Sequence, residues 1–231
     1  MRLDNQFLYL EPSDFIPQKK ISGHTFVALC GLDPFKKQGD ALLEMHRFIK
    51  SEVDPKWLRR GTVAEKIVAK IYQKEHQITT YDAKEIGYDN FKNDPNFGGI
   101  IDIEVDNKTL VEVKSKSLDK KEFIINNPPK AEIYQAMLYA YLRNYDYFTM
   151  EWIFFDKPTE DEIFQGKAPT TLKNLQRYTK VFFVDRDEMK KLMSVALNFV
   201  KAFRLRRPIP LAYFSDEVIQ KIKEKINEKQ A

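Results

Sequence analysis

The chain has few of the residues that build redox sites and soft-metal sites. Its 231 residues include one cysteine, Cys30, and three histidines, His24, His46 and His76. One cysteine cannot form an intrachain disulfide, and a zinc or iron–sulfur site made of cysteine needs several thiolates. The histidines lie in separate segments without metal-ligand spacing, and we expect His46 and His76 to be helix-surface residues. Any bound metal is therefore expected to rest on oxygen ligands.

Long apolar stretches are also missing. No segment approaches the roughly 20 apolar residues of a membrane-spanning helix, and residues 1–15 lack the basic start and apolar run of a signal peptide. With 31% charged residues, a membrane protein is disfavoured and an intracellular location is expected. The apolar fraction of 43% is still sufficient for a core, and the length favours one α/β domain.

Lysine and arginine residues are concentrated in three segments of the chain. The net charge of +4 is modest, whereas lysines and arginines gather in residues 56–70, 114–121 and 201–207. Such clusters are either solvated faces or a surface for phosphates. The choice between the two depends on a motif for phosphate chemistry beside them.

Turn and cap residues divide the chain into alternating elements. Helices are expected from Asp40 to about Ile49, from Asp54 through Tyr72, from Asn127 through Tyr141, from Asp185 to about Phe203, and after Ser215. The chain is expected to be extended over 78–88, to form a hairpin over 98–115, and to form short buried strands at 152–155 and 180–184. The first forty residues show no regular pattern.

The hairpin segment carries one apolar and one charged face. In residues 101–105 and 111–116, isoleucine and valine alternate with aspartate, glutamate and lysine. Asn107 tolerates the left-handed conformation of a short hairpin turn. A turn centred there places Asp102 opposite Glu112.

Two facing carboxylates make chemical sense as a metal site. Like charges opposite each other destabilise a sheet, and a divalent cation removes that repulsion. Mg²⁺ prefers hard oxygen ligands and keeps several waters. Lys114, on the same face, would contact the attacking water or the negative charge that develops on a phosphate. The alternative is an ordinary hairpin with a solvated charged face, because short D…ExK matches are common.

The sequence on both sides of the hairpin carries a resemblance. GIIDIE resembles the GxxD motif of RecB-like nucleases, VEVK the ExK motif, and YQAMLYAYL the QxxxY motif. RRGTVAEKI resembles the helix that precedes the site, and Ile101 stands where the PD-(D/E)xK superfamily name puts proline. ISGHTFVALCGLDPF near the start, with EWIFFD and VFFVDRDEMKKLMSVALNFVKAF later, resembles the YqaJ-like viral recombination exonucleases, the family of phage lambda exonuclease.

This resemblance implies a mixed central β-sheet flanked by helices, with a restriction-endonuclease-like core. One nuclease domain would span 1–231, with a DNA-end-binding elaboration at 1–53, a core at 54–205 and a C-terminal helix at 206–231. The implied activity is Mg²⁺-dependent hydrolysis of duplex DNA from a 5′ end, with two metal ions and with Mn²⁺ able to substitute. The resemblance also implies a role in phage-type recombination, a trimeric ring and a single-strand annealing recombinase as partner.

The resemblance assigns roles residue by residue. Asp102 and Glu112 would hold the metals, the Val113 carbonyl would add a ligand, and Glu65 would contribute directly or through water. Lys114 would position or activate the water, and Gln135 would orient the site from the following helix. The residues expected to contact DNA are Lys20, Ser22 and His24 at the terminal phosphate, and Arg59, Arg60, Ser115, Lys116 and Tyr139 elsewhere. For Gln135 and Tyr139 the alternative is packing in an amphipathic helix.

Two other functions stay open. The same fold could serve a structure-specific or single-strand-specific endonuclease, which a closed circular substrate would distinguish. The chain could also be a non-catalytic DNA-binding module. Intact Asp102, Glu112 and Lys114 argue against such decay.

Overall fold

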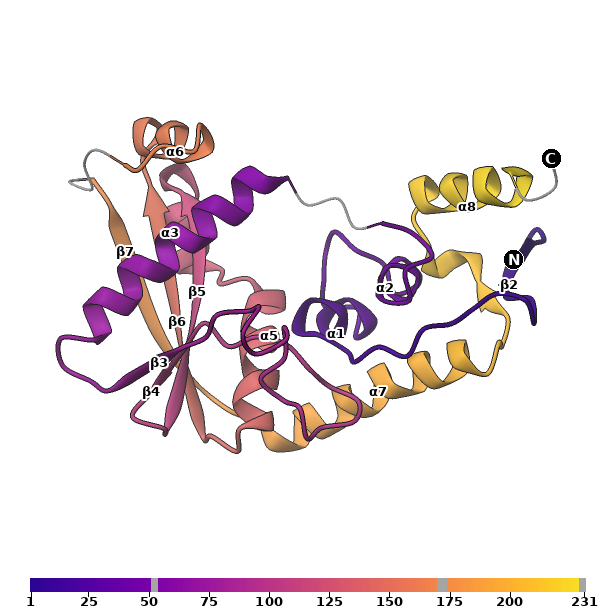
Figure 1. The fold of residues 1–231 in the computed structure, drawn as a ribbon, viewed down its shortest axis with the longest axis horizontal. Coiled ribbons are helices and arrows are strands. Elements are labelled where there is room, and N and C mark those ends of the chain that lie inside the picture. The colour runs from indigo at the N-terminus through magenta and orange to yellow at the C-terminus, as the bar shows by residue number, and fades with distance from the viewer. Residues whose placement is uncertain (51–53, 170–173, 229–231) are drawn as a thin grey trace. The chain divides into compact units, whose positions relative to one another are not determined.

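The structure is a computed structural model that describes residues 1–50, 54–169 and 174–228 (Figure 1). Contacts group these residues into two compact units. Unit 1 contains 1–50, 93–98 and 187–228, and unit 2 contains 54–92, 99–169 and 174–186. One nuclease domain over 1–231 stays a prediction. Residues 51–53, at the end of its expected elaboration, and 229–231, at the end of its expected last helix, lie outside the described residues.

Unit 2 is built on a mixed five-stranded sheet in the order β3-β4-β5-β6-β7. β5 and β6 run parallel, and the other neighbours are antiparallel. The strands are β3 Ile78–Thr80, β4 Ile103–Val105, β5 Thr109–Ser117, β6 Tyr147–Phe155 and β7 Gln176–Phe183. The mixed sheet, covered by helices, confirms the predicted fold class.

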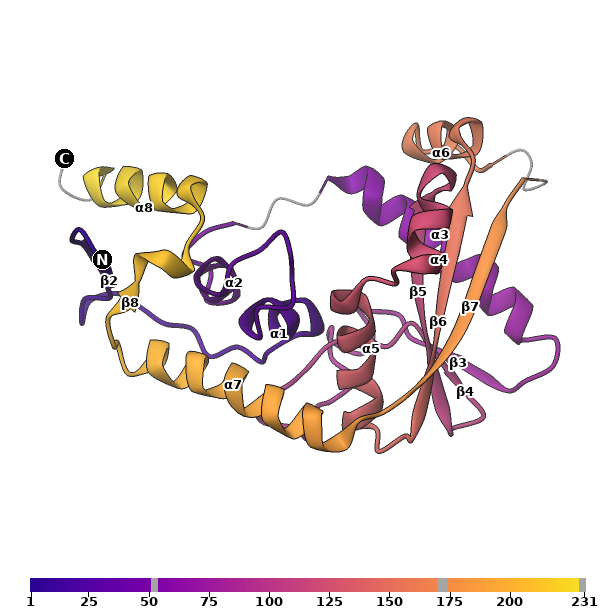
Figure 2. The same cartoon turned by 180° about the vertical axis from the view of Figure 1, so that it is seen from behind.

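Helices cover both faces of this sheet. α3 Pro55–Tyr72 lies over one face, and α5 Lys130–Leu142 lies over the other (Figures 1 and 2). Val111 and Val113 of β5 pack in one core cluster with Ala64 of α3. Because side chains alternate along a strand, the intervening residues of β5 face α5. Unit 2 also contains the short helices η1 Leu118–Lys120, α4 Lys121–Asn126 and α6 Lys157–Phe164.

Local sequence explains the start of α3. The Asp54 carboxylate accepts a hydrogen bond from the Lys56 N–H at 3.0 Å, and Pro55 occupies the first helical position. Proline there removes an N–H that would have no helical partner. The predicted start of this helix is confirmed.

The hairpin between β4 and β5 turns where the sequence predicts. Asp106 and Asn107 have φ of 51° and 53°, and the Lys108 N–H donates to the Val105 carbonyl at 3.0 Å. Val105 pairs with Thr109, and Ile103 pairs with Val111. Continued by one residue, this register brings Asp102 across from Glu112.

Two strand predictions are wrong in extent or burial. The extended segment ends at Thr80, because Asp82 begins a turn by accepting the Lys84 N–H at 2.8 Å. The strand at 180–184 is not buried, since β7 is the last strand of the sheet and Phe183 is 79% exposed. The strand at 152–155 is confirmed as part of the longer β6.

Unit 1 contains a small antiparallel sheet and helices. Its strands are β1 Arg2–Leu3, β2 Phe7–Tyr9 and β8 Ile209–Pro210, and its helices are α1 Gly23–Leu29, α2 Gln38–Met45, all but the first residue of α7 Arg186–Arg204, η2 Leu211–Tyr213 and α8 Asp216–Glu228. The prediction that the first forty residues are irregular is therefore wrong, because they contain β1, β2, α1 and the start of α2. No helix among the described residues is long and apolar enough to cross a membrane.

Asp40 and Ser215 meet at the start of α8. Asp40 is not the cap of α2, because the helix begins at Gln38 and the Asp40 carboxylate accepts the Ser215 N–H at 3.0 Å. The Ser215 hydroxyl accepts the Val218 N–H at 3.3 Å, as the predicted cap requires. Asp40 thus stabilises a helix distant in sequence.

His46 is buried, which corrects the expected surface position. Its ring stacks on Phe203 with centroids 4.5 Å apart, and Nδ1 lies 2.9 Å from the Leu42 carbonyl. Nε2 is buried without a hydrogen-bond partner. Burial lowers the pKa of His46, and the nearby Arg204 charge adds to that effect, while the Leu42 carbonyl opposes it.

Protonation of His46 is expected to destabilise the protein at acidic pH. The folded state favours the neutral imidazole. His46 therefore does not lower the free energy of unfolding above its ordinary pKa of 6.5, and lowers it as the pH falls below that value. The free energy of unfolding in urea should fall between about pH 7.5 and about pH 5.5, and less so in His46→Leu. Thr62→Ala, a change at an exposed residue without an ionisable group, should keep the wild-type slope. Equal slopes in His46→Leu and wild type would contradict this assignment.

Candidate active site

Five predicted residues converge in unit 2. Glu112 and Lys114 lie on β5, and Asp102 directly precedes β4. Gln135 comes from α5 and Glu65 from α3. Two helices and a hairpin therefore supply the side chains, as the order of the motifs predicts.

Hydrogen bonds join three of these residues into a triangle. The Lys114 ammonium donates to Glu112 Oε1 at 2.8 Å and to Gln135 Oε1 at 3.3 Å. Gln135 Nε2 donates to the same Glu112 Oε1 at 2.9 Å. Glu112 is 2% exposed and Gln135 is 7% exposed. Gln135 thus binds both the carboxylate and the lysine, which is an orienting position.

Asp102 Oδ2 and Glu112 Oε2 differ in whether they accept a hydrogen bond. Asp102 Oδ2 accepts the Val113 N–H at 2.8 Å, so the hairpin backbone holds this side chain. Glu112 Oε2 is buried without a hydrogen-bond partner. A buried acceptor left without a partner costs about 1–3 kcal/mol, and more if it is charged. Coordination by the Val113 carbonyl stays a prediction.

Burial and neighbouring carboxylates raise the pKa of Asp102 and of Glu65. The pKa of Asp102 lies well above its ordinary value because of burial and then the charges of Glu112 and Glu65. Burial and the Glu112 charge likewise raise the pKa of Glu65. Burial alone lowers the pKa of Lys114, but Glu112 and Asp102 outweigh it and the net shift is upward. The Lys114 ammonium therefore lies among several carboxyl groups.

This donor set fits a hard divalent cation. Among the described residues, no three His, Cys, Asp or Glu side chains already meet around one cation position. The charge of Glu112 nevertheless acts on both Asp102 and Glu65, so the three carboxylates are within electrostatic reach, and Glu112 Oε2 lacks a partner. Mg²⁺ binds such oxygens and would relieve both the repulsion and the missing contact.

Glu132 is a residue that sequence reasoning missed. Its carboxylate forms an ion pair with Lys116 and accepts the Trp152 indole N–H at 2.8 Å. Lys116, expected to contact DNA, is therefore held by α5. The spacing of three residues between Glu132 and Gln135 places both on one helix face and was the available signal.

Tyr139 packs inside unit 2. It is 3% exposed and stacks on Phe91 with ring centroids 5.5 Å apart. Gly99 has φ of 145°, and a Cβ at that position would overlap the Tyr139 ring. The geometry supports the packing alternative for Tyr139 and leaves no exposed surface for the expected DNA contact.

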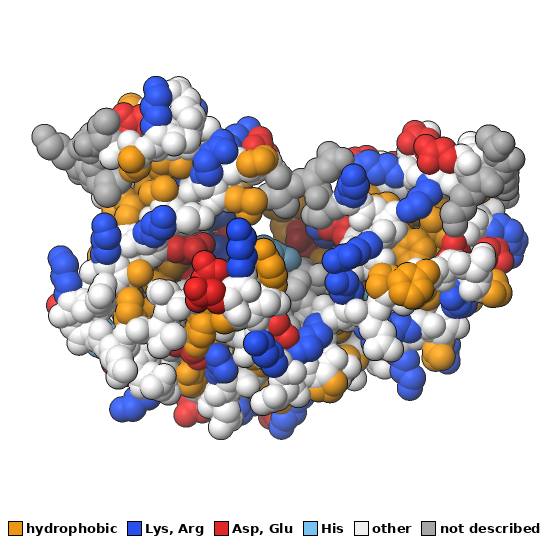
Figure 3. Space-filling model, in the orientation of Figure 1, with side chains coloured by type: hydrophobic (Ala, Val, Ile, Leu, Met, Phe, Trp, Pro, Cys, Tyr) orange, Lys and Arg blue, Asp and Glu red, His pale blue; other side chains and the backbone are white. Residues whose placement is uncertain are grey.

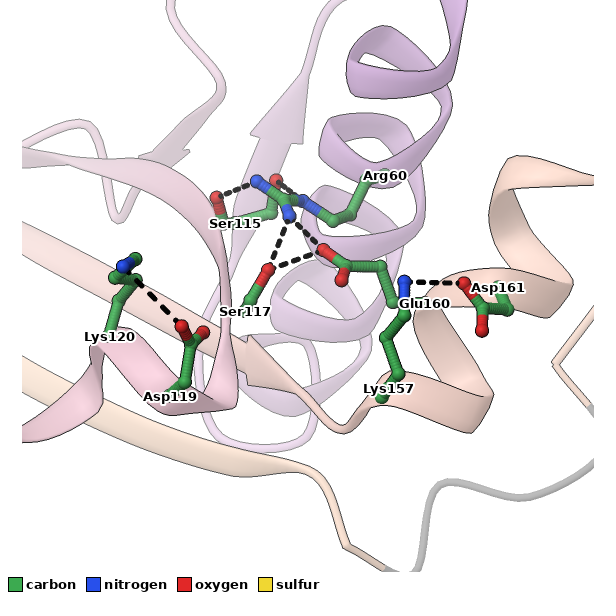
Figure 4. A network of polar contacts seen from close by, with 8 residues as sticks. All are labelled: Arg60, Ser115, Ser117, Asp119, Lys120, Lys157, Glu160 and Asp161. Carbon is green, nitrogen blue, oxygen red and sulfur yellow. Dashed lines mark hydrogen bonds and ion pairs between the residues drawn. The ribbon is translucent and has the colours of Figure 1, made fainter.

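Arg60 joins α3, β5 and α6 (Figure 4). Its guanidinium donates to the Ser115 carbonyl at 2.9 Å and to the hydroxyls of Ser115 and Ser117, each at 3.3 Å. It also forms a buried ion pair with Glu160. These contacts hold all three guanidinium nitrogens of Arg60 within the protein, and a DNA contact by Arg60 stays a prediction. Ser115 takes part in the same network.

The other expected DNA contacts stay predictions. Arg59 is exposed and donates to the Phe164 carbonyl at 2.7 Å. Lys20, Ser22 and His24 lie in unit 1 at the start of α1, where the Ser22 and Thr25 hydroxyls are 3.1 Å apart. Cys30 is half-buried, and burial raises the pKa of its thiol to about 12.

Comparison with known proteins adds a family and a fold. The profile of the YqaJ-like viral recombinase domain matches residues 16–140. An alkaline exonuclease from Laribacter hongkongensis, LHK-Exo, is similar with a TM-score of 0.56 at 13% identity, over 90% of this chain and 94% of the other. Its complex with dAMP gives a TM-score of 0.57 at the same identity and coverage.

A third solved structure has a similar fold. A phage-related exonuclease from Haemophilus somnus has a TM-score of 0.53 at 13% identity, over 82% of this chain and 96% of the other. No curated protein matches the chain. At these identities, the structural likeness concerns the fold.

Arg60→Ala is expected to lower the free energy of unfolding by about 3 kcal/mol, because it leaves Glu160 buried without its partner. Urea unfolding measures the loss. Arg60→Met combined with Glu160→Leu should lose much less, since neither charge then remains buried. Arg59→Ala, at the exposed neighbour, should stay within about 0.5 kcal/mol of wild type. Unchanged stability in Arg60→Ala, with weaker DNA binding only, would contradict this structural role and support the predicted DNA contact.

Proposed function

The chain belongs to the YqaJ-like viral recombinase family, with the lambda-exonuclease-like PD-(D/E)xK fold, and from this premise we propose that it is a Mg²⁺-dependent exonuclease that digests duplex DNA from 5′ ends. The observation that carries the proposal is the state of Glu112. One of its oxygens is held by Lys114 and Gln135, and the other is buried, unpartnered and close to further carboxylates.

In this proposal Mg²⁺ would be held by Asp102, Glu112 and Glu65. The family resemblance implies two ions per site and a further ligand, the Val113 carbonyl. Bound Mg²⁺ supplies Lewis-acid stabilisation of the negative charge that develops on the scissile phosphate. The Val113 N–H fixes Asp102, and Gln135 fixes Glu112. Their geometry therefore depends on the fold before any ligand binds, which reduces reorganisation during the reaction.

Lys114 is placed to act on the reacting phosphate or water. Its ammonium is held by Glu112 and Gln135, which orient it beside the carboxylates. An upward-shifted pKa keeps it protonated, so it serves as a donor and a positive charge rather than as a base. It would position the attacking water and stabilise the charge that develops at the phosphate.

Exonuclease action is supported by similarity, whereas duplex specificity rests on the family resemblance. Both relatives named above are exonucleases, and one is described in complex with dAMP. The 5′ polarity, the 3′ single-strand product, the trimeric ring and the annealing recombinase rest on the family resemblance. Lys20, Ser22 and His24 are proposed to favour a 5′-phosphate, because cationic and hydroxyl donors gain charge-assisted hydrogen bonds only when it is present.

Digestion of end-labelled DNA tests the proposal. Linear duplex with a 5′ label should lose the label first in Mg²⁺, a closed circle should stay intact, and EDTA should stop the reaction. Asp102→Asn and Glu112→Gln should each lower turnover by about 1,000-fold, since each weakens a metal ligand, while circular dichroism stays unchanged. A cut circle would indicate an endonuclease, and near wild-type turnover in either variant would refute the site.

Lys114→Ala should lower the rate of the chemical step far more than DNA affinity. Loss of one charge-stabilising donor typically costs about 100- to 1,000-fold in rate. Single-turnover cleavage in Mg²⁺ is compared with duplex binding in Ca²⁺, with Lys108→Ala in the hairpin turn as the control. If Lys114→Ala reduced both quantities equally, Lys114 would be a phosphate clamp.

A further inference from the structure

An apolar groove runs along the outer side of α3 in unit 2. It encloses about 820 Å³ and extends from Leu58 to Ile71 of α3, with Ile163 of α6 and the segment 166–169 on its other side. Val63, Ile67 and Ile71 supply the apolar floor. Val63 and Ile67 also pack against the core, so the floor is held in place from below. A groove of this kind is typical of a binding surface.

Positive charge borders this groove, which we call the α3 groove. Arg59, Lys66, Lys70 and Lys167 line it, and all four are exposed. Among its described lining residues, none is acidic. Lysine and arginine side chains lie beside apolar side chains over α3 (Figure 3). The surface therefore complements an apolar ligand that carries negative charge.

We propose that the α3 groove docks an amphipathic helix of a partner protein, with apolar residues on one face and aspartate or glutamate beside them. Leu58 and Ile71 are separated by thirteen helical steps, or about 20 Å at 1.5 Å per residue. A partner helix of about the same length would fill the groove. This proposal does not depend on the nuclease activity.

The form of the groove favours a helix over an extended peptide. An extended peptide satisfies its backbone hydrogen bonds by pairing with a strand edge, whereas here side chains of the helix α3 line the length of the groove. Pro169, on the opposite side, has no N–H to donate. A helix brings its backbone hydrogen bonds with it and needs only apolar and ionic contacts.

Two other occupants fit less well. Duplex DNA presents phosphates and sugars, and an apolar floor gives them no hydrogen bonds in return for lost water. The helix α8 of a second copy carries acidic residues, but it already buries its apolar side chains, with Val218 7% exposed and Ile222 1% exposed. A separate helix with an uncovered apolar face is the better match.

Fluorescence anisotropy with the full chain and a synthetic peptide tests the proposal. The probe is a labelled helical peptide of about 16 residues, with leucine at helical spacing and glutamate elsewhere. A scrambled peptide of equal composition and a version with lysine for glutamate serve as probe controls. The ordered acidic peptide should bind at least about 10-fold more tightly than either, and less tightly in high salt.

Protein variants locate the binding. Leu58→Ser removes an exposed apolar contact and Lys66→Glu reverses an exposed charge, so each should weaken binding of the ordered acidic peptide by about 5-fold or more. Lys108→Glu, an exposed lysine outside the groove, should bind as wild type. Circular dichroism checks that each variant is folded.

Several results would overturn the proposal. Equal binding of ordered and scrambled peptides would, and so would wild-type affinity in both groove variants. Displacement of the peptide by unlabelled duplex, together with weaker duplex binding in Lys66→Glu than in Lys108→Glu, would assign the groove to DNA. A dimer seen by light scattering and lost in Leu58→Ser would assign it to a second copy.

Discussion

The buried carboxylate of Glu112 is the constraint on which the arrangement of unit 2 depends. A charge at 2% exposure is unfavourable unless it is paired and hydrogen-bonded. The pairing requires Lys114 from the same strand and Gln135 from α5, so the helix must pack at one position along β5. The orientation of α5 and the geometry of the site are thus one requirement.

Local sequence predicted the parts of the site whose cause is local. Asp54 followed by Pro55 starts α3, and the hairpin turns at Asn107 because this residue type accepts a positive φ. Alternation along the two strands then brings Asp102 and Glu112 together. Each step needs only residues near one another in the chain, so one sequence was sufficient for this part of the prediction.

The features that the sequence did not reveal depend on distant residues. Arg60 reads as a basic surface residue until α6 brings Glu160 to it from 100 residues away. His46 reads as a helix-surface residue until Phe203 covers it. β7 reads as a buried strand, but burial depends on its place at the edge of the sheet. Composition and periodicity carry no information on which distant element covers a side chain.

β5 separates stability from chemistry by the alternation of its side chains. Val111, Val113, Ser115 and Ser117 face α3, where they form the core and bind Arg60. Glu112, Lys114 and Lys116 face α5 and meet Gln135 and Glu132. A register shift of one residue would exchange these faces, placing charges in the core and valines in the site. The hairpin turn that sets this register is therefore a requirement of the chemistry, although no residue of the turn touches the site.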